Sequence, residues 1–167
     1  MSQIEIIILA ILYEEERYGY EIESLIQQRK LRDWINIGFS TIYNSLKNLE
    51  KKGLIGSRHE EEYGSPSRKV FFIKLTAKAS VRDLIKSILI SPQNNNEFII
   101  GLAFTHLLTK PEIKECFKKY KENLEKKRDL MQKKLSEDNE IYLKTLISYS
   151  FKLTETEMEW IEAYIKE

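Results

Sequence analysis

Apolar residues in the first part of the chain recur at helical spacing in three stretches, each separated from the next by polar residues or glycine. The stretches cover Gln3–Glu14, residues 21–30, and a segment that starts at Ser40 as the expected N-cap and stops at Gly53. The pattern therefore predicts three short amphipathic helices.

The period changes after Gly53. Short runs typical of strands cover residues 54–59 and 69–75, and they flank a turn-rich segment over residues 63–67. Three helices followed by a two-stranded hairpin is the order of elements in a winged helix-turn-helix. We therefore expect a mainly α fold with a small β-hairpin, in which residues 1–79 form a winged helix-turn-helix domain.

Residues 80–167 are mostly helix-forming, and we expect a helical, coiled-coil-like dimerisation domain. The pattern predicts helices over residues 76–90, 97–108, 111–136, 141–153 and 155–166. Residues 97–108 are apolar on most sides and are expected to be buried. The apolar seam along residues 111–136 has coiled-coil spacing and needs a partner. The residues expected at the dimer interface are Ile113, Phe117, Tyr120, Leu124, Met131, Leu135, Trp160 and Tyr164.

Charge is unevenly distributed over the 167 residues, although the formal net charge is only +1. Residues 1–28 carry a net charge of −5, residues 29–69 carry +4 and residues 70–79 add +2, whereas residues 80–167 are balanced. The positive charge therefore lies around the third predicted helix and the hairpin, where it would attract a polyanion.

The third predicted helix carries polar side chains on the face opposite its apolar residues. If Ile42, Leu46 and Leu49 point inward, the helical step of about 100° per residue turns the polar residues outward. Asparagine can pair with adenine, serine can bond to bases or phosphates, and lysine can meet guanine or a phosphate. The candidate DNA-binding residues of this helix are Ser40, Thr41, Tyr43, Asn44, Lys47 and Lys51. A solvated face on an ordinary surface helix would look similar, so this helix alone leaves both interpretations open.

The predicted hairpin carries cations that would project as a wing. Arg68 and Lys69 follow the turn-rich tip and complete the set of candidate DNA-binding residues, and Arg58 lies on the preceding strand. Such cations would follow the phosphate backbone or enter the minor groove. The glutamates at residues 60–62 would repel phosphates, so we expect them to face elsewhere. A plain surface hairpin is the alternative.

Four segments together resemble the PadR family of transcriptional regulators. They cover residues 8–13, 18–22, 40–55 and 68–76, and the third has the family's threonine, tyrosine, two leucines and closing Gly-Leu-Ile at the expected spacing. The remainder is similar to the all-helical C-terminal domain of the virulence-activator type within that family.

This resemblance implies a homodimer that binds an inverted-repeat operator and most often represses transcription, with the third helix in the major groove and the wing on the flanking minor groove. It places Thr41, Tyr43 and Asn44 on the recognition helix, and Arg68 and Lys69 on the wing. Tyr43 is expected to combine DNA contact with packing. Modulation by a small-molecule effector stays open.

No catalytic residue, metal or cofactor is expected. His59 and His106 have no ligand-spaced partners, and the single cysteine, Cys116, fits a reducing compartment. Phosphate-binding loops and hydrolase motifs are absent from the sequence. The apolar run over residues 98–108 is too short to cross a bilayer. We therefore expect a cytoplasmic protein that is not an enzyme and has no membrane span.

Two other function classes remain open. One is a winged-helix protein-interaction module, which the near-neutral charge permits. The other is a helical ligand carrier or enzyme with a pocket in the apolar region over residues 98–108. Salt-sensitive retention of duplex DNA would argue against the first, and ligand binding without residues 1–79 would support the second.

Overall fold

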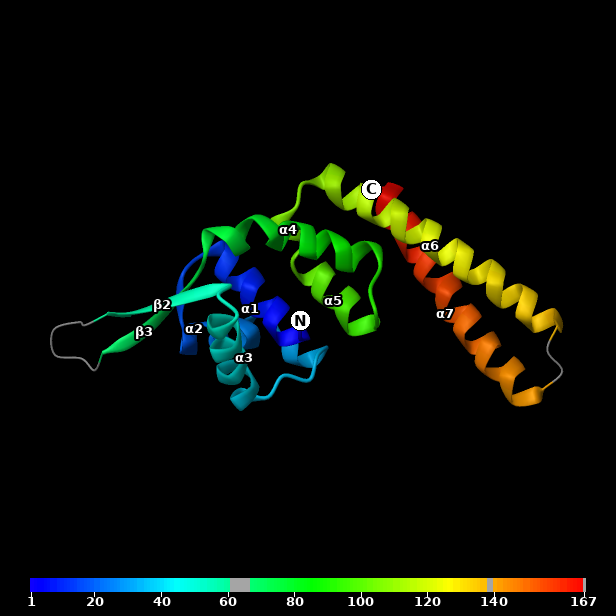
Figure 1. Ribbon diagram of the computed structural model, residues 1–167. Coiled ribbons are helices and arrows are strands. Elements are labelled where there is room, and N and C mark those ends of the chain that lie inside the picture. Colours follow the sequence, from blue (N-terminus) through cyan, green and yellow to red (C-terminus); the bar gives the residue numbers. More distant parts are fainter. Residues whose placement is uncertain (61–66, 138–139, 167) are drawn as a thin grey trace. The chain divides into compact units, whose positions relative to one another are not determined.

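The computed structural model describes residues 1–60, 67–137 and 140–166, and Figure 1 shows its elements. The chain forms two compact units, one made of Met1–Ile88 and Pro92–Leu107, the other of Leu89–Ser91 and Leu108–Glu167. The elements up to residue 107 are α1 (Gln3–Glu14), β1 (Arg17–Tyr18), α2 (Gly19–Gln28), η1 (Leu31–Asp33), α3 (Phe39–Lys51), β2 (Ile55–Glu60), β3 (Arg68–Ile73), α4 (Leu75–Ile90), α5 (Asn95–Ala103) and η2 (Thr105–Leu107). They are followed by α6 (Lys110–Glu137) and α7 (Ile141–Lys166).

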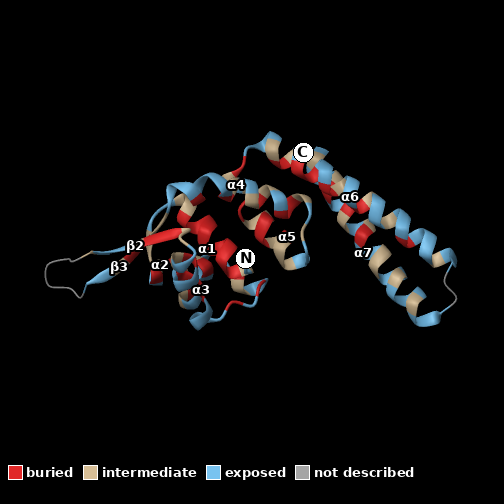
Figure 2. Ribbon diagram, viewed as in Figure 1, coloured by how far each residue is buried: buried red, intermediate tan, exposed pale blue. Residues whose placement is uncertain are grey.

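α1 is the central helix of the first unit. All its side chains from Ile4 to Leu12 are buried, as the red ribbon in Figure 2 shows, because α1 contacts α3, β3 and α5. A capping box starts the helix: the Ser2 hydroxyl accepts from the Glu5 N–H, and the Glu5 carboxylate accepts from the Ser2 N–H. The predicted helix is confirmed, and its burial explains its high isoleucine content.

The segment before α2 contains a short strand that the sequence did not predict. β1 pairs with β3, and α2 begins at Gly19, earlier than the predicted start at residue 21. The Glu21 carboxylate accepts a 2.8 Å hydrogen bond from the Tyr18 N–H and so fixes the start of α2. A strand of only two residues leaves no periodic signal in the sequence.

The ends of α3 agree only in part with the prediction. Ser40 is not the N-cap: Gly38, in an extended conformation, takes that position, and Ser40 lies in the first turn of the helix. Gly53 ends the helix as predicted, since its φ of +72° is a left-handed conformation that favours glycine. The next N–H, that of Leu54, bonds back to the Leu49 carbonyl at 3.0 Å.

The three strands form an antiparallel sheet in the order β1-β3-β2. β2 and β3 pair in continuous register from Ile55 opposite Ile73 to Glu60 opposite Arg68. Gly56 pairs with Phe72, and a Cβ at position 56 would lie 2.5 Å from Cζ of that ring. A side chain at position 56 would therefore displace the Phe72 ring. β1 adds a third strand to the predicted hairpin.

The predicted helix over residues 97–108 is α5 followed by the short helix η2. Phe98, Ile100 and Phe104 are buried in the core, and α5 contacts α1. This region therefore packs with the winged helix-turn-helix elements, and the first compact unit extends to Leu107. The reason is that α1 is apolar on most of its sides and needs α5 to cover it.

The second unit is an antiparallel pair of long helices, α6 and α7 (Figure 1). The sequence predicted separate helices over residues 141–153 and 155–166, but α7 is continuous. Thr154, at the predicted break, is buried and donates a 3.0 Å hydrogen bond to the Ser150 carbonyl one turn earlier. A threonine in that position does not interrupt the helix, so the predicted break was wrong.

The architecture is a winged helix-turn-helix joined to a helical hairpin, as the sequence predicted. Within the described ranges, no helix combines the length and the hydropathy that a bilayer crossing needs.

Candidate nucleic-acid interface

α3 presents the predicted polar face to solvent. Ile42, Leu46 and Leu49 are buried, which fixes the rotation of the helix about its axis. The polar residues that this rotation exposes are Ser40, Thr41, Asn44, Lys47 and Lys51. The structure thus brings these candidate DNA-binding side chains together on one surface.

Tyr43 is half-buried and lies at the edge of this face. Its ring packs against Gly19 at the start of α2, where a Cβ would lie 3.0 Å from Cε1 of the ring, and against Phe39 at a centroid distance of 5.4 Å. This packing is the structural half of the double role that the sequence predicted. A larger residue than glycine at position 19 would push the ring away from its place.

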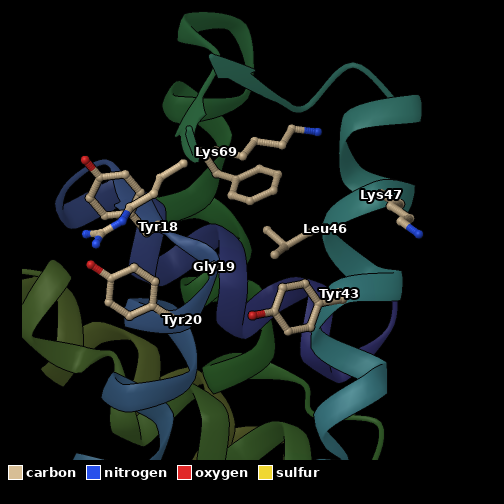
Figure 3. A pocket seen from close by; sticks show the side chains of 9 residues that line it. Tyr18, Gly19, Tyr20, Tyr43, Leu46, Lys47 and Lys69 are labelled. Atoms are coloured by element: carbon tan, nitrogen blue, oxygen red, sulfur yellow. The ribbon is translucent and has the colours of Figure 1, made fainter. Parts of the chain in front are cut away.

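A cleft of about 320 Å³ separates α3 from the wing (Figure 3). Its walls are largely aromatic and apolar, and its rim is cationic. The lining residues are Tyr18, Gly19, Tyr20, Tyr43, Leu46, Lys47, Arg68, Lys69 and Phe71. The rings of Tyr18 and Tyr20 are stacked with centroids 5.5 Å apart. Sequence reasoning missed these two tyrosines as site residues, because β1 and the start of α2 were interpreted as a break.

The two cations predicted on the wing have different surroundings. Arg68 is exposed and, among the described residues, has no ion pair. Lys69 is half-buried: its Nζ lies 2.9 Å from Oε2 of Glu50 on α3 and 5.1 Å from the centroid of the Phe71 ring. The charge of Lys69 is therefore engaged within the protein, whereas the charge of Arg68 is available to a ligand.

The remaining wing residues form a second paired group. Arg58 makes ion pairs with Glu16 and Glu60, and Glu60 also accepts a 2.8 Å hydrogen bond from the Tyr18 hydroxyl. The hydrogen bond from Tyr18, and to a smaller extent that from Arg58, lowers the pKa of the Glu60 carboxyl. Glu60 is thus directed at partners within the protein, in line with the prediction. The other two glutamates and the glycine-containing tip, residues 61–66, lie outside the described residues.

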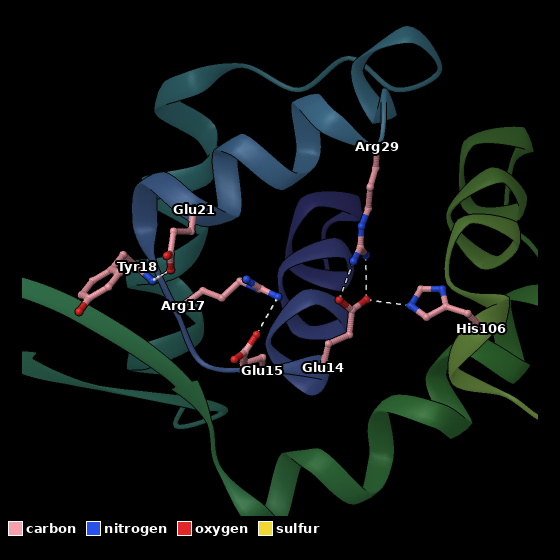
Figure 4. A network of polar contacts seen from close by, with 7 residues as sticks. All are labelled: Glu14, Glu15, Arg17, Tyr18, Glu21, Arg29 and His106. Atoms are coloured by element: carbon pink, nitrogen blue, oxygen red, sulfur yellow. Dashed lines mark hydrogen bonds and ion pairs between the residues drawn. The ribbon is translucent and has the colours of Figure 1, made fainter.

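A network of polar contacts joins the ends of α1 and α2 to η2 (Figure 4). Arg29 at the end of α2 donates two hydrogen bonds, of 2.7 and 2.6 Å, to the carboxylate of Glu14 at the end of α1. Nε2 of His106 lies 2.8 Å from the same carboxylate. Burial raises the pKa of Glu14, but the hydrogen bonds from Arg29 and His106 outweigh burial, and the pKa is lowered.

An ion pair between buried Glu5 and half-exposed Lys52 fixes the end of α3 against α1. The Lys52 Nζ donates to both oxygens of Glu5, at 2.7 and 2.9 Å. The Glu5 side chain is 4% exposed and that of Lys52 is 50% exposed. Burial raises the pKa of Glu5, but the hydrogen bonds from Lys52 and from the Ser2 N–H lower it further than burial raises it. The carboxylate is therefore charged at neutral pH and holds the end of α3 against α1.

Most of the residues predicted for a dimer interface are buried within the chain. α6 packs on α7 of the same chain, and its inward side includes Ile113, Phe117, Tyr120, Leu124 and Met131. Leu135 is half-buried, while Trp160 and Tyr164 are partly exposed and hold the Phe117 ring at centroid distances of 5.7 and 4.9 Å. The α6 seam does need a partner, but its own chain provides one.

Part of the chain is similar in sequence to known proteins. A family model described as "Transcriptional regulator PadR-like family" matches residues 8–80. A protein of Lysinibacillus sphaericus, described as "Uncharacterized protein X", is 32% identical over 85 residues, which cover 51% of this chain and 77% of that protein.

Two solved structures are also similar to the chain. Bacillus subtilis PadR in complex with operator DNA is 19% identical, with 97% of each chain covered and a TM-score of 0.45. A PadR family transcription regulator from hypervirulent Clostridium difficile is 27% identical, with 59% of this chain and 99% of that chain covered and a TM-score of 0.48.

Proposed function

The chain belongs to the PadR-like family and is a DNA-binding transcriptional regulator, and from that premise we propose that it acts in the cytoplasm as a homodimer that represses transcription from an inverted-repeat operator. α3 is the recognition helix in the major groove, and the wing formed by β2 and β3 lies along the flanking minor groove.

The exposed polar face of α3 is the observation that carries this proposal. Asn44 and Lys47 lie one turn apart in the middle of this face, and Ser40 lies a turn earlier. An asparagine can bond adenine in two places, and a lysine can reach guanine or a phosphate. Arg68 on the wing and Lys47 at the cleft rim add charges that would meet phosphates and make binding salt-dependent.

Dimerisation is proposed to use the outer face of α7. This helix has a second apolar stripe besides the one packed on α6, and it is exposed in the chain: Tyr142, Leu146, Tyr149 and Leu153. Their alternating spacing of four and three residues is that of a coiled-coil seam. A second copy that covers this stripe would hold two recognition helices about one helical turn of DNA apart, roughly 34 Å, and would impose a palindromic operator.

A small-molecule effector has a candidate site in the cleft between α3 and the wing. Its volume of about 320 Å³ is within the range of ligand pockets, and apolar walls with a cationic rim suit a small apolar anion. Such an occupant would compete with DNA for Lys47 and Arg68. Fluorescence titration with an anilinonaphthalene sulfonate, with and without duplex DNA, tests whether both ligands exclude each other.

Selection of bound fragments from the source genome, followed by gel shift at several salt concentrations, tests DNA binding and the operator. We expect retained fragments to share an inverted repeat and Asn44→Ala to weaken binding by about 1–3 kcal/mol at a contacted base pair. Gln93→Ala, which also removes an exposed amide of the first unit, is the matched control and should bind as the parent does. Equal binding by Asn44→Ala and the parent would refute the proposed orientation of α3.

Sedimentation equilibrium tests the proposed dimer. Leu146→Asp combined with Leu153→Asp should give monomers that keep their helical circular dichroism, because both side chains are exposed in the chain. Lys133→Asp on the charged face of α6 is the control. A dimer that survives the double substitution would exclude the α7 stripe as the interface.

A further inference from the structure

Glu50 is an acidic residue placed among the cations of the proposed DNA-binding surface. It lies in the last turn of α3, next to the exposed Lys51 and close to the base of the wing. A carboxylate in this position opposes phosphate binding, since binding to the DNA backbone depends on positive charge. Its contacts indicate why the protein has an acid there.

The Glu50 carboxylate connects α3 to both long strands of the wing. Its Oε1 accepts a short hydrogen bond from the hydroxyl of Ser57 on β2, and its Oε2 lies 2.9 Å from Nζ of Lys69 on β3. Ser57 and Lys69 are not opposite each other in the sheet, because Ser57 pairs with Phe71. One side chain therefore determines how two strands meet the recognition helix.

The same contacts decide which cations a phosphate can reach. Hydrogen bonds from Ser57 and Lys69 lower the pKa of the Glu50 carboxyl, so it is ionised at neutral pH. Lys69 is held between this carboxylate and the Phe71 ring. Lys47 and Arg68 have no ion pair among the described residues. Of the cations at the cleft, Lys69 alone is neutralised by an acid of α3.

We propose that Glu50 determines the specificity of DNA binding, by fixing the wing against α3 and by withholding the charge of Lys69 from phosphates. This rests on the proposed function, in which α3 and the wing face DNA. Non-specific affinity comes almost wholly from phosphate neutralisation, whereas specific affinity also needs correctly placed base contacts. Glu50 removes one cation from the phosphate contacts, which lowers non-specific affinity, and it positions the helix that contacts the bases. It therefore increases the specificity ratio, which is the specific affinity divided by the non-specific affinity.

Glu50→Gln tests the proposal, because it removes the charge but keeps an oxygen that can accept from Ser57. We expect affinity for a duplex of random sequence to rise by about three- to tenfold at low salt, and the slope of log K against log salt to steepen by about 0.9, the value for one more neutralised phosphate. Affinity for the best fragment from the genomic selection should stay constant or fall, so the specificity ratio falls.

Two controls separate this mechanism from a general charge effect and from misfolding. Asp83→Asn makes the same change of net charge at an exposed site on α4 and should leave the salt slope unchanged. Glu50→Gln combined with Lys69→Gln should restore the parent slope, because the released cation is removed. Circular dichroism and the thermal midpoint of each variant show whether the fold is retained.

The possible failures are distinguishable. If Glu50→Gln and Asp83→Asn behave alike, or if the double variant keeps the steeper slope, the role of Glu50 is refuted while DNA binding by the parent stands. If the parent binds no duplex even at low salt, the proposed function fails, and the role of Glu50 fails with it.

Discussion

Removal of the ammonium group of Lys52 should destabilise the first unit although Lys52 is itself half-exposed. The substitution Lys52→Met keeps most of the aliphatic chain and leaves the Glu5 carboxylate, 4% exposed, without its ionic partner. A buried group that loses its partner costs about 1–3 kcal/mol. The Ser2 N–H still donates to Glu5 at 2.9 Å, and water can reach the place of a half-exposed ammonium. We therefore expect a loss of about 1–2 kcal/mol.

Urea unfolding followed by circular dichroism measures this loss, and thermal unfolding should show a decrease of roughly 4–16 °C in the midpoint of the first unit, from about 4–8 °C per kcal/mol. Lys51→Met is the matched control, because Lys51 is the exposed neighbour at the same end of α3. It removes the same interaction with the helix dipole but leaves no buried carboxylate without its ionic partner. Its cost should stay below about 1 kcal/mol.

A double substitution makes the reasoning refutable. Glu5→Gln can keep the capping hydrogen bond with Ser2, and it removes the charge that Lys52→Met leaves unpaired. Glu5→Gln combined with Lys52→Met should therefore be more stable than Lys52→Met alone. If the double variant is less stable, or if Lys52→Met is as stable as the parent, the buried charge is not the cause.

The pH dependence of this pair follows from the lowered pKa of Glu5. An acid whose pKa is lower in the folded state contributes stability that is present above its unfolded pKa, about 4.3, and is lost as the pH falls through the folded pKa. In Lys52→Met the carboxylate lacks that stabilisation. The difference between parent and variant should therefore be largest near pH 7 and shrink below about pH 4.

Other substitutions test separate parts of the structure. Gly56→Ala should cost about 1–3 kcal/mol in thermal unfolding, because the added methyl group would press on Phe72; an unchanged midpoint would contradict the register. Glu14→Gln should lower stability at pH 7, and its effect should shrink as the pH falls below about 4, since the hydrogen bonds from Arg29 and His106 lower the pKa of Glu14; a constant difference between pH 7 and the acid range would argue against the ion pair. Phe117→Ala should destabilise the pair of α6 and α7 by about 3–5 kcal/mol and lower the temperature at which these helices unfold. A thermal midpoint by circular dichroism equal to that of the parent would contradict this expectation.

Local signals in the sequence were sufficient for much of the fold. α1, the end of α3 at Gly53, the hairpin and α6 follow from periodicity and from residues that cap or stop a helix. β1 and the division of residues 97–108 into α5 and η2 could not be predicted in this way. Both depend on contacts with distant segments, β1 on β3 and α5 on α1.

The candidate site shows the same limit. Periodicity alone predicted that Asn44 and Lys47 face outward, and both are exposed in the structure. The sequence shows Lys69 as one more wing cation, but its pairing with Glu50, 19 residues away, depends on how the strands return to α3. The residues predicted for a dimer seam show a related limit, since most of them are buried against their own chain. A coiled-coil pattern shows that a helix needs a partner, but it does not show whether that partner is another copy or, as here, α7 of the same chain.

The burial of α1 matters while the chain is being synthesised. α1 is synthesised before the last element that covers it, α5, which ends about ninety residues later at Ala103. At a synthesis rate of about 5–20 residues per second, the isoleucines of α1 remain uncovered by α5 for roughly 5–20 s. Chaperones that bind apolar segments would meet this nascent helix during that interval. A minimal DNA-binding fragment of this regulator should accordingly retain residues 1–107. A fragment that ends before α5 would leave part of the apolar surface of α1 exposed and prone to aggregation.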